Sequence, residues 1–380
     1  MGGFVSPDWS GRLGRVWAAC APAARILIVS TPVNIKYLTG FDGTAGLLVT
    51  APERSWLLLD GRYERAARQA QREGRLAAVD VTPVPARFDQ ALGALIGTLG
   101  AGEVAFEAEQ VTVATLAAWQ RAAPAVEFVP AYRTIERLRL IKDAWEVAAI
   151  RRACAALSGV GRGLHEWVRA DRTEREIARD IDQAMTTAGF SHPAFPTIVA
   201  SGPNSAHAHA RPTDRRLASG DLVVLDFGGV LDGYCGDLTR MAGVGRVGTE
   251  ARALFEAVRA AQGAALAAVR AQAPVHEVDA AARDLLTARG LGEAFIHATG
   301  HGLGLDVHEA PRLAKRAAPS DASAPEEPPE FRHLAAGMVC TIEPGAYVDG
   351  LGGVRLEDDV LVTTDGCDVL TDVPSDLLLV

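Results

Sequence analysis

The amino-acid sequence predicts an α/β (α+β) protein of two domains, and three observations support this. The chain has 380 residues, which is more than one hydrophobic core usually organises. Residues 1–132 alternate short apolar runs with helical segments, as α/β domains do. Residues 133–380 begin with a long helical pattern and continue with apolar runs that end in glycine-rich turns. We therefore place the domain boundary between residues 132 and 133.

Short apolar runs predict the strands of the first domain, and one charged amphipathic segment predicts a helix. The run from residue 25 to 30 is followed by Gly40 and Gly43, which are typical of a turn between strands. The predicted strands lie at 25–30, 45–49, 55–60, 104–107 and 127–129, and the predicted helix lies at 62–71.

Helical patterns dominate the start of the second domain. Apolar residues at helical spacing predict one long helix from residue 135 towards 157, and another at 249–272. Thr173 precedes Glu176 by three residues, the spacing of a capping box, which predicts a helix within 171–188. Residues 314–330 are rich in Ala, Pro, Ser and Glu without periodicity, and this composition predicts a surface insertion that buries little.

Composition excludes several classes of protein. The chain is 48% hydrophobic and 22% charged, which is typical of a soluble globular protein. Its net charge of -9 disfavours a nucleic-acid partner, and no apolar run reaches the roughly 20 residues of a membrane helix. The five cysteines are scattered and lack a Cys-x-x-Cys spacing. We therefore expect a cytoplasmic protein with no membrane or nucleic-acid partner.

Two segments of the sequence contain the same features in the same order. Each has a predicted strand, a carboxylate, a glycine-containing turn, a returning strand and a second carboxylate. In the first, Asp226 follows the apolar run 222–225 and Asp237 lies on the returning strand. In the second, Glu343 follows 338–342 and Glu357 returns after three glycines. Four converging carboxylates would repel one another, and two divalent cations would remove this conflict. Oxygen ligands with one imidazole, which His301 can supply, suit Mn, Fe, Co or Zn.

The stretches LDFG, GDLTR, HATGHGLGLDVHEAP, TIEPG and GGVRLEDD resemble, in order, the motifs of the pita-bread metallopeptidases. This family includes methionine aminopeptidase, aminopeptidase P and prolidase. The resemblance implies a pita-bread catalytic domain at 133–380 that binds two divalent metal ions, with manganese as the expected metal and Zn, Co or Fe as alternatives. It implies that Asp226 binds one metal, that Asp237 and Glu357 bridge both, and that His301 and Glu343 complete the other.

The same resemblance assigns further residues to the reaction. Glu343 would transfer a proton, and His308 would donate a hydrogen bond to the carbonyl oxygen as it gains charge. His209 would contact the substrate near the bond that breaks, and His297 would line the pocket for proline. Arg355 would support a bridging carboxylate or the substrate. Tyr234 is a candidate for the site lining, with ordinary packing as the alternative.

The first domain, with YLTGFDGTAGLLV and LLLDGRYERAARQ, resembles the creatinase-like N-terminal domain of prolidases. This resemblance implies a homodimer in which residues 1–132 affect substrate access. Asp42 and Arg62 are candidate contacts to a partner's site; alternatively, Asp42 caps a turn and Arg62 pairs with Glu64 or Glu53. Prolidases also carry an arginine upstream of the EPG motif that holds the substrate carboxylate, and Arg332 lies in that neighbourhood.

The expected activity is hydrolysis of the peptide bond before proline in Xaa-Pro dipeptides. The first alternative is an aminopeptidase P, which releases the N-terminal residue from longer Xaa-Pro-Yaa peptides. The second is a creatinase-like or binding protein without peptidase activity, although the chain retains all five candidate metal ligands.

Overall fold

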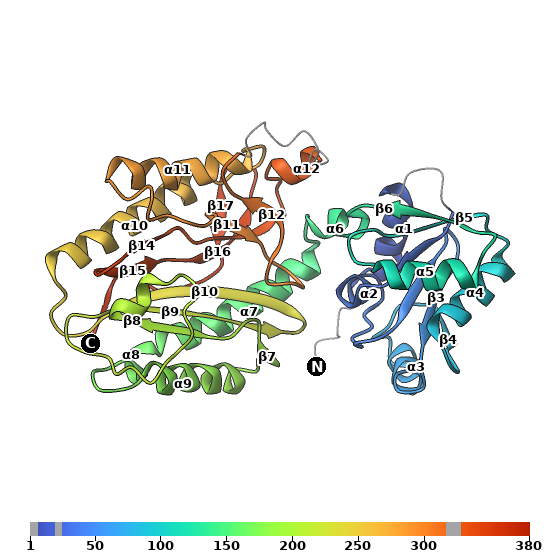
Figure 1. Cartoon of the computed structure of the whole chain (residues 1–380), viewed down its shortest axis with the longest axis horizontal. Coiled ribbons are helices and arrows are strands. Elements are labelled where there is room, and N and C mark those ends of the chain that lie inside the picture. The colour runs from blue at the N-terminus through green and yellow to red at the C-terminus, as the bar shows by residue number, and fades with distance from the viewer. Residues whose placement is uncertain (1–6, 20–24, 317–327) are drawn as a thin grey trace. The chain divides into compact units, whose positions relative to one another are not determined.

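The computed structural model describes residues 7–19, 25–316 and 328–380 (Figure 1). The chain divides into two compact units, Met1–Arg139 and Leu140–Val380. This division falls later than the predicted boundary at 132/133 because helix α6 (Thr134–Arg139) packs within the first unit. Ile135 is fully buried there, and Arg139 donates a hydrogen bond of 2.9 Å to the side-chain oxygen of Asn34.

The first unit is a mixed sheet with helices, in agreement with the predicted α/β class. Strand order is β4-β3-β2-β1-β5-β6, with β1 antiparallel to β2 and parallel to β5. The strands are β1 (Leu27–Val29), β2 (Leu47–Thr50), β3 (Ser55–Leu59), β4 (Asp80–Pro83), β5 (Glu103–Glu107) and β6 (Glu127–Ala131). The other helices are α1 (Trp9–Ala19), α2 (Pro32–Thr39), α3 (Glu64–Arg72), α4 (Phe88–Leu99) and α5 (Val113–Ala122).

The second unit begins with helix α7 (Ala144–Arg162), and the long helix predicted from residue 135 is interrupted before it. Asp143 starts α7 with a capping box: its side chain accepts from the backbone N–H of Glu146, and the Glu146 carboxylate accepts from that of Asp143. This reciprocal pairing defines a helix N-terminus, so one continuous helix was the wrong prediction. The capping box predicted at Thr173 and Glu176 is present at the start of α9 (Glu174–Thr187).

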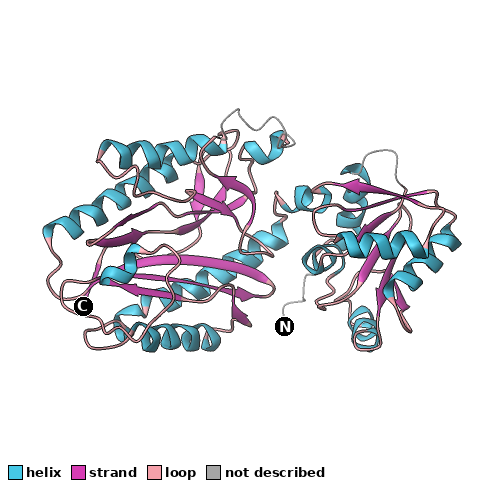
Figure 2. Ribbon diagram, in the orientation of Figure 1, coloured by secondary structure: helices cyan, strands magenta, loops and turns pink. Residues whose placement is uncertain are grey.

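Helices cover the strands of the second unit on two sides (Figure 2). Helices α7 and α9 pack against the sheet of β9 and β10, while α10 and α11 pack beside strands of the other sheets. The predicted helix 249–272 is α10, which ends four residues earlier. The helices are α8 (Leu164–Trp167), η1 (Gly202–Ala206), α10 (Thr249–Ala268), α11 (Val275–Ala288) and α12 (Pro329–Arg332).

The strands of the second unit form three sheets that supply the site. One has the order β18-β10-β9-β7 with β8 paired to β9, another has the order β12-β11-β13-β16-β17, and β14 pairs with β15. The strands are β7 (His192–Pro193), β8 (Ile198–Ser201), β9 (Leu222–Leu231), β10 (Tyr234–Gly243), β11 (Gly300–Gly302), β12 (Glu309–Leu313), β13 (Val339–Ile342), β14 (Gly345–Val348), β15 (Gly352–Arg355), β16 (Asp358–Val362), β17 (Cys367–Val369) and β18 (Leu378–Leu379).

Two expectations concern segments outside these elements. Within the predicted insertion 314–330, residues 317–327 lie outside the described residues. Among the helices that the structure does describe, none is long and apolar enough to cross a lipid bilayer.

Candidate metal centre and substrate cavity

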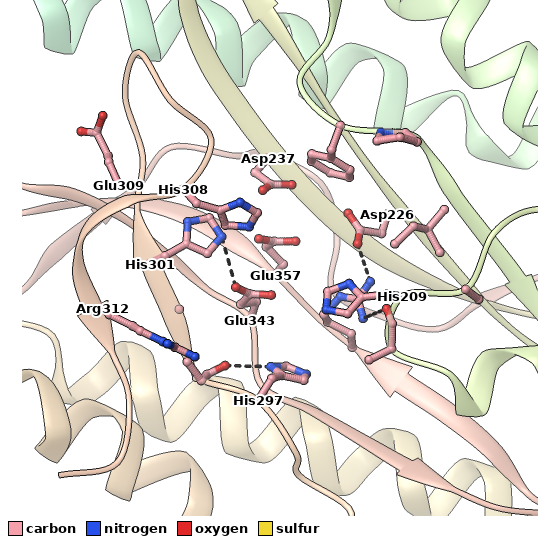
Figure 3. Close-up of a pocket in the computed structure, with 18 of the residues that line it drawn as sticks. His209, Asp226, Asp237, His297, His301, His308, Glu309, Arg312, Glu343 and Glu357 are labelled. Atoms are coloured by element: carbon pink, nitrogen blue, oxygen red, sulfur yellow. Dashed lines mark hydrogen bonds and ion pairs between the residues drawn. The ribbon is translucent and has the colours of Figure 1, made fainter. Parts of the chain in front are cut away.

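A cavity of about 740 Å³ lies within the second unit, lined by residues of its strands and loops (Figure 3). Its size falls in the range of pockets for small ligands. The charged and imidazole side chains that line it come from several loops and strands. They are His209, Arg211, Asp226, Asp237, His297, His301, His308, Glu309, Arg312, Glu343, Arg355 and Glu357.

The first predicted hairpin consists of β9 and β10, and it places two carboxylates on one face. Its turn is Asp232-Gly233, and both residues have positive φ, as a two-residue type I′ turn requires. This turn fixes a register in which Asp226 is opposite Thr239 and Asp237 is opposite Gly228. Asp237 and Thr239 are two residues apart, so Asp226 and Asp237 are diagonal neighbours on the same face.

The second pair of carboxylates lies where two paired strands separate. Strands β13 and β16 pair as far as Ile342 and Asp358, and Glu343 and Glu357 are the adjacent residues on each side. The backbone N–H of Glu343 donates to the carbonyl of Thr299 at 2.7 Å. The Thr239 hydroxyl donates to the Glu357 carboxylate at 2.6 Å, which joins this pair to the first hairpin.

His301 lies on β11 and completes the predicted set of five. Its Nδ1 is 3.0 Å from the carbonyl oxygen of Gly302. Because a carbonyl only accepts, Nδ1 carries the ring proton and Nε2 is left as an electron-pair donor. Atoms of Asp237, His301 and Glu357 that could each bind a cation lie within 4.8 Å of one another. Glu343 is adjacent, with an oxygen 3.3 Å from His301 Nε2.

The electrostatics of this cluster fit a cation. Burial, followed by the charges of the neighbouring carboxylates, holds the pKa of Asp237 and of Glu357 well above the ordinary range. In the described part of the chain, Oδ1 of Asp226 and Oδ1 of Asp237 are buried without a hydrogen-bond partner. Buried carboxylate oxygens without donors are costly, and divalent cations would satisfy both the oxygens and the charge. The donor set therefore fits the predicted metal ions.

Metal binding is expected to release protons. Carboxyl groups with a raised pKa hold protons in the metal-free protein, and a cation requires them deprotonated. The affinity for Mn²⁺ should therefore rise with pH through the weakly acidic range. Titration calorimetry of chelator-treated protein at pH 6, in two buffers with different ionisation enthalpies, measures the protons released. Equal heats in both buffers would contradict this expectation.

Three further predicted histidines surround the carboxylates. His297 is half-buried: its Nδ1 is 2.8 Å from the carbonyl of Ala298, and its Nε2 is 3.0 Å from the Tyr347 hydroxyl. Burial lowers the pKa of His297, which favours the neutral ring. His308 stacks edge-on against His301 with ring centroids 4.3 Å apart. His209 lies on the loop after η1, and both His209 and His308 are exposed at the cavity.

Arg355 connects Asp226 to Tyr347, which in turn contacts His297. Its guanidinium forms an ion pair with Asp226 and donates to the Tyr347 hydroxyl at 2.5 Å. Since that hydroxyl accepts a hydrogen bond from Arg355, its own hydrogen can point to His297 Nε2. The sequence analysis did not identify Tyr347, which is four residues after Glu343 on the β14–β15 hairpin. The pairing of these two strands brings its hydroxyl to His297 and Arg355.

The structure does not place Tyr234 in the lining of the cavity. Its hydroxyl donates to the buried Glu146 carboxylate at 2.9 Å, and its ring packs edge-on against Trp145. Tyr234 and Asp237 are three positions apart on β10, so their side chains point to opposite faces. The prediction that Tyr234 contacts substrate was wrong, and the packing alternative describes its position.

Two arginines in the cavity wall were not predicted. Arg312 is directly opposite His301 in the β11–β12 pair, so both side chains lie on the same face. Arg211 follows His209 in the loop. Within the described ranges, neither guanidinium forms a hydrogen bond or ion pair. Arg332, which lies in the sequence near the expected position of a carboxylate-binding arginine, is not in the lining of this cavity.

Two charge pairs hold segments of the cavity wall. Lys142 forms a buried ion pair with Glu309 at 2.7 Å, next to His308. On α11, Asp279 accepts from the backbone N–H of Thr299, and Arg283 donates to the carbonyl of His297 at 2.8 Å. These pairs fix the segments that carry His308 and His297.

The two candidate contacts of the first unit have partners within that unit. Asp42 pairs with Lys36 at 2.7 Å, and Arg62 pairs with Asp60 at 2.7 Å. The pairing of Arg62 with Glu64 or Glu53 was therefore wrong, because Asp60 lies closer in the turn before α3. Contact of either residue with a partner subunit stays a prediction.

A buried set of carboxylates and an imidazole, in a cavity sized for a small ligand, is the site of a metal-dependent hydrolase. The sequence matches metallopeptidase family M24 over residues 148–364 and the creatinase/prolidase N-terminal domain over residues 21–141. The chain belongs to metallopeptidase family M24, and the predicted fold of an N-terminal creatinase-like domain with a pita-bread domain is confirmed.

Several relatives and solved structures match nearly the whole chain. The Xaa-Pro dipeptidase of Pyrococcus furiosus is 32% identical over 354 residues, which are 93% of this chain and 94% of the relative. The structure of a Xaa-Pro dipeptidase from Bacillus anthracis has a TM-score of 0.90 at 30% identity and covers 98% of this chain and 100% of that one. An X-Pro aminopeptidase from Thermotoga maritima has a TM-score of 0.84 at 28% identity, covering 96% and 100%.

Proposed function

We propose that this metallopeptidase hydrolyses the peptide bond preceding proline in Xaa-Pro dipeptides. The single observation that carries the proposal is the convergence of the five predicted ligands on one small cavity of a chain whose relatives include Xaa-Pro dipeptidases. We assign Asp226, Asp237, His301, Glu343 and Glu357 to two divalent cations, with manganese as the metal. Oxygen donors with one imidazole suit manganese.

When bound, the two cations lower the pKa of a water molecule and polarise the substrate carbonyl. The protein's own residues then bind the substrate and move protons. Glu343, whose pKa burial raises, accepts a proton at its carboxylate and returns it to the departing nitrogen. His308 and His209 line the cavity on different loops and donate to the substrate carbonyl and backbone. Neutral His297, fixed by Tyr347, forms the wall for the proline ring.

The two unpaired arginines support a dipeptide over a longer peptide. A dipeptide places a carboxylate directly on its proline, and a guanidinium binds a carboxylate in a charge-assisted pair. Arg312 and Arg211 supply this charge in the cavity wall, where most other charged groups are acidic. An aminopeptidase P substrate continues beyond proline and has no charge at that position.

An aminopeptidase P is the second candidate, and the similarity to the X-Pro aminopeptidase of Thermotoga maritima favours it. One assay separates the candidates: chelator-treated protein is reloaded with Mn²⁺, Co²⁺ or Zn²⁺ and offered Ala-Pro, Met-Pro and Ala-Pro-Ala. We expect faster turnover of the dipeptides, with Mn²⁺ most effective. Faster turnover of the tripeptide would assign the aminopeptidase activity. Metal binding without hydrolysis of any of the three would assign a binding role.

We also propose that the protein is a cytoplasmic homodimer. The cysteines in the described part of the chain, which excludes Cys20, are free thiols, as is typical of a reducing compartment. The N-terminal domain of the creatinase/prolidase type supports the dimer. Light scattering at micromolar concentration measures the oligomeric state, and a mass of one chain would contradict it.

A further inference from the structure

A buried glutamate closes the base of the loop that carries His209. Glu174 is the first residue of α9 and has no exposed surface. It lies outside the cavity lining and has no place in the chemistry proposed above. The loop consists of residues 202–212, between β8 and the segment that leads to β9, and it includes η1. Glu174 binds residues at both ends of this loop.

Each oxygen of Glu174 binds one end of the loop. Oε1 accepts from the backbone N–H of Ser201 and from its hydroxyl, both at 2.7 Å. Oε2 accepts from the backbone N–H of Thr213 at 3.0 Å and from its hydroxyl at 2.7 Å. The side-chain amide of Asn204 lies 3.1 Å from both oxygens. A single carboxylate thus binds both Ser201 and Thr213, one residue at each end of the loop.

The opposite side of the loop contacts the proposed metal centre. The carbonyl of Ala208 accepts from Arg355 at 3.2 Å, and the Ser205 hydroxyl accepts from the backbone N–H of Gly353 at 2.9 Å. His209 follows Ala208 and is exposed at the cavity. Its imidazole forms no hydrogen bond with any other residue that the structure describes. The position of this ring therefore depends on the backbone of the loop.

We propose that Glu174 is a positioning residue that sets the location of His209 by holding the two ends of its loop together. The inference rests on the proposed function, since it deepens the role of His209 there. Each oxygen of the carboxylate accepts from a backbone N–H, of Ser201 or of Thr213, and a backbone N–H can only donate. In Glu174→Gln, one oxygen becomes an NH₂ group that faces a backbone N–H, so one end of the loop loses its backbone hydrogen bond to this side chain. Displacement of a substrate-contacting group by about 1 Å can cost about 100-fold in rate.

The first test measures the loop itself and needs neither metal nor substrate. Hydrogen exchange of the full-length, metal-free protein is compared between wild type and Glu174→Gln. We expect faster exchange in peptides that cover 198–215 and unchanged exchange in α7 and α10. The matched control is Glu176→Gln, which changes a carboxylate of the same helix turn that caps only Thr173. Unchanged exchange at 198–215 in Glu174→Gln would overturn the proposal.

The second test is a double-mutant cycle on Ala-Pro hydrolysis with Mn²⁺-loaded enzyme. We expect Glu174→Gln to lower kcat/KM by about 10- to 100-fold, with unchanged Mn²⁺ affinity. In a His209→Ala background, the same change should have no further effect, because the group that it displaces is absent. Equal losses in both backgrounds would show that Glu174 acts on the fold in general, and would overturn the proposal.

The two tests distinguish a failure of this proposal from a failure of the proposed function and from misfolding of the variant. If wild-type enzyme does not hydrolyse Ala-Pro, the proposed function fails, while the exchange experiment still decides whether Glu174 holds the loop. If Glu174→Gln does not fold, Thr213→Val replaces it in both tests. Thr213→Val keeps the side-chain volume, removes one donor to the carboxylate, and should give the same pattern with a smaller loss.

Discussion

Replacement of Asp237 by asparagine should abolish the hydrolysis of Ala-Pro by Mn²⁺-loaded enzyme. Asp237 contributes to the cluster with His301 and Glu357, and its Oδ1 is buried without a protein partner. An amide is a poor ligand and supplies no charge to offset a cation. The expected loss exceeds about 100-fold, because even residues that only support a ligand contribute about 10- to 100-fold. Steady-state kinetics and metal analysis of the dialysed protein measure both effects.

The same substitution should stabilise the metal-free protein. An amide removes the cost of burying this carboxylate near Asp226 and Asp359, and it adds a donor, which should raise the free energy of unfolding by about 1 to 3 kcal/mol. Urea denaturation of chelator-treated protein measures this change. Asp232→Asn in the turn of the same hairpin is the matched control, since its half-exposed carboxylate pairs with Arg152. An active Asp237→Asn enzyme would contradict the assignment of the metal centre.

Replacement of Arg312 by methionine should raise the KM for Ala-Pro by about 10- to 100-fold. This range corresponds to the loss of a hydrogen bond to a charged group, about 1.5 to 3 kcal/mol. The value of kcat should change less, because the carboxylate of the substrate keeps its charge throughout the reaction. Initial rates over a range of Ala-Pro concentrations measure the two constants separately.

The control for Arg312 is a substrate without the carboxylate. Ala-Pro amide should bind wild type weakly and lose nothing further in Arg312→Met. Arg211→Met tests the other unpaired guanidinium of the cavity with the same two substrates. Equal losses for the acid and the amide in Arg312→Met would show that Arg312 does not bind the carboxylate.

The first hairpin of the candidate metal centre could be predicted from the sequence, because an apolar run, a turn and a returning strand follow one another there. The Asp232-Gly233 turn determines the register of β9 and β10, and this register places Asp226 and Asp237 on one face. The convergence of the two hairpins was not predictable from spacing alone. It depends on contacts such as that of Thr239 with Glu357, which join residues far apart in the chain. The resemblance to a known family supplied that information.

Other features were missed for identifiable reasons. The sequence contains Asp143 and Glu146 at the same spacing as Thr173 and Glu176, so the start of α7 could have been recognised. The three-residue offset between Tyr234 and Asp237 could have excluded Tyr234 from the site. Arg312 had no local signal: its place beside His301 follows from the pairing of β11 with β12.

The three substrate-side histidines are anchored independently of one another. Glu174 holds the loop of His209, Lys142 holds the residue after His308 through Glu309, and Arg283 holds the carbonyl of His297. None of these anchors is among the five assigned metal ligands. Substrate preference can therefore diverge, in evolution or in a directed library, by exchanging one such segment at a time while the hydrolytic centre is inherited intact.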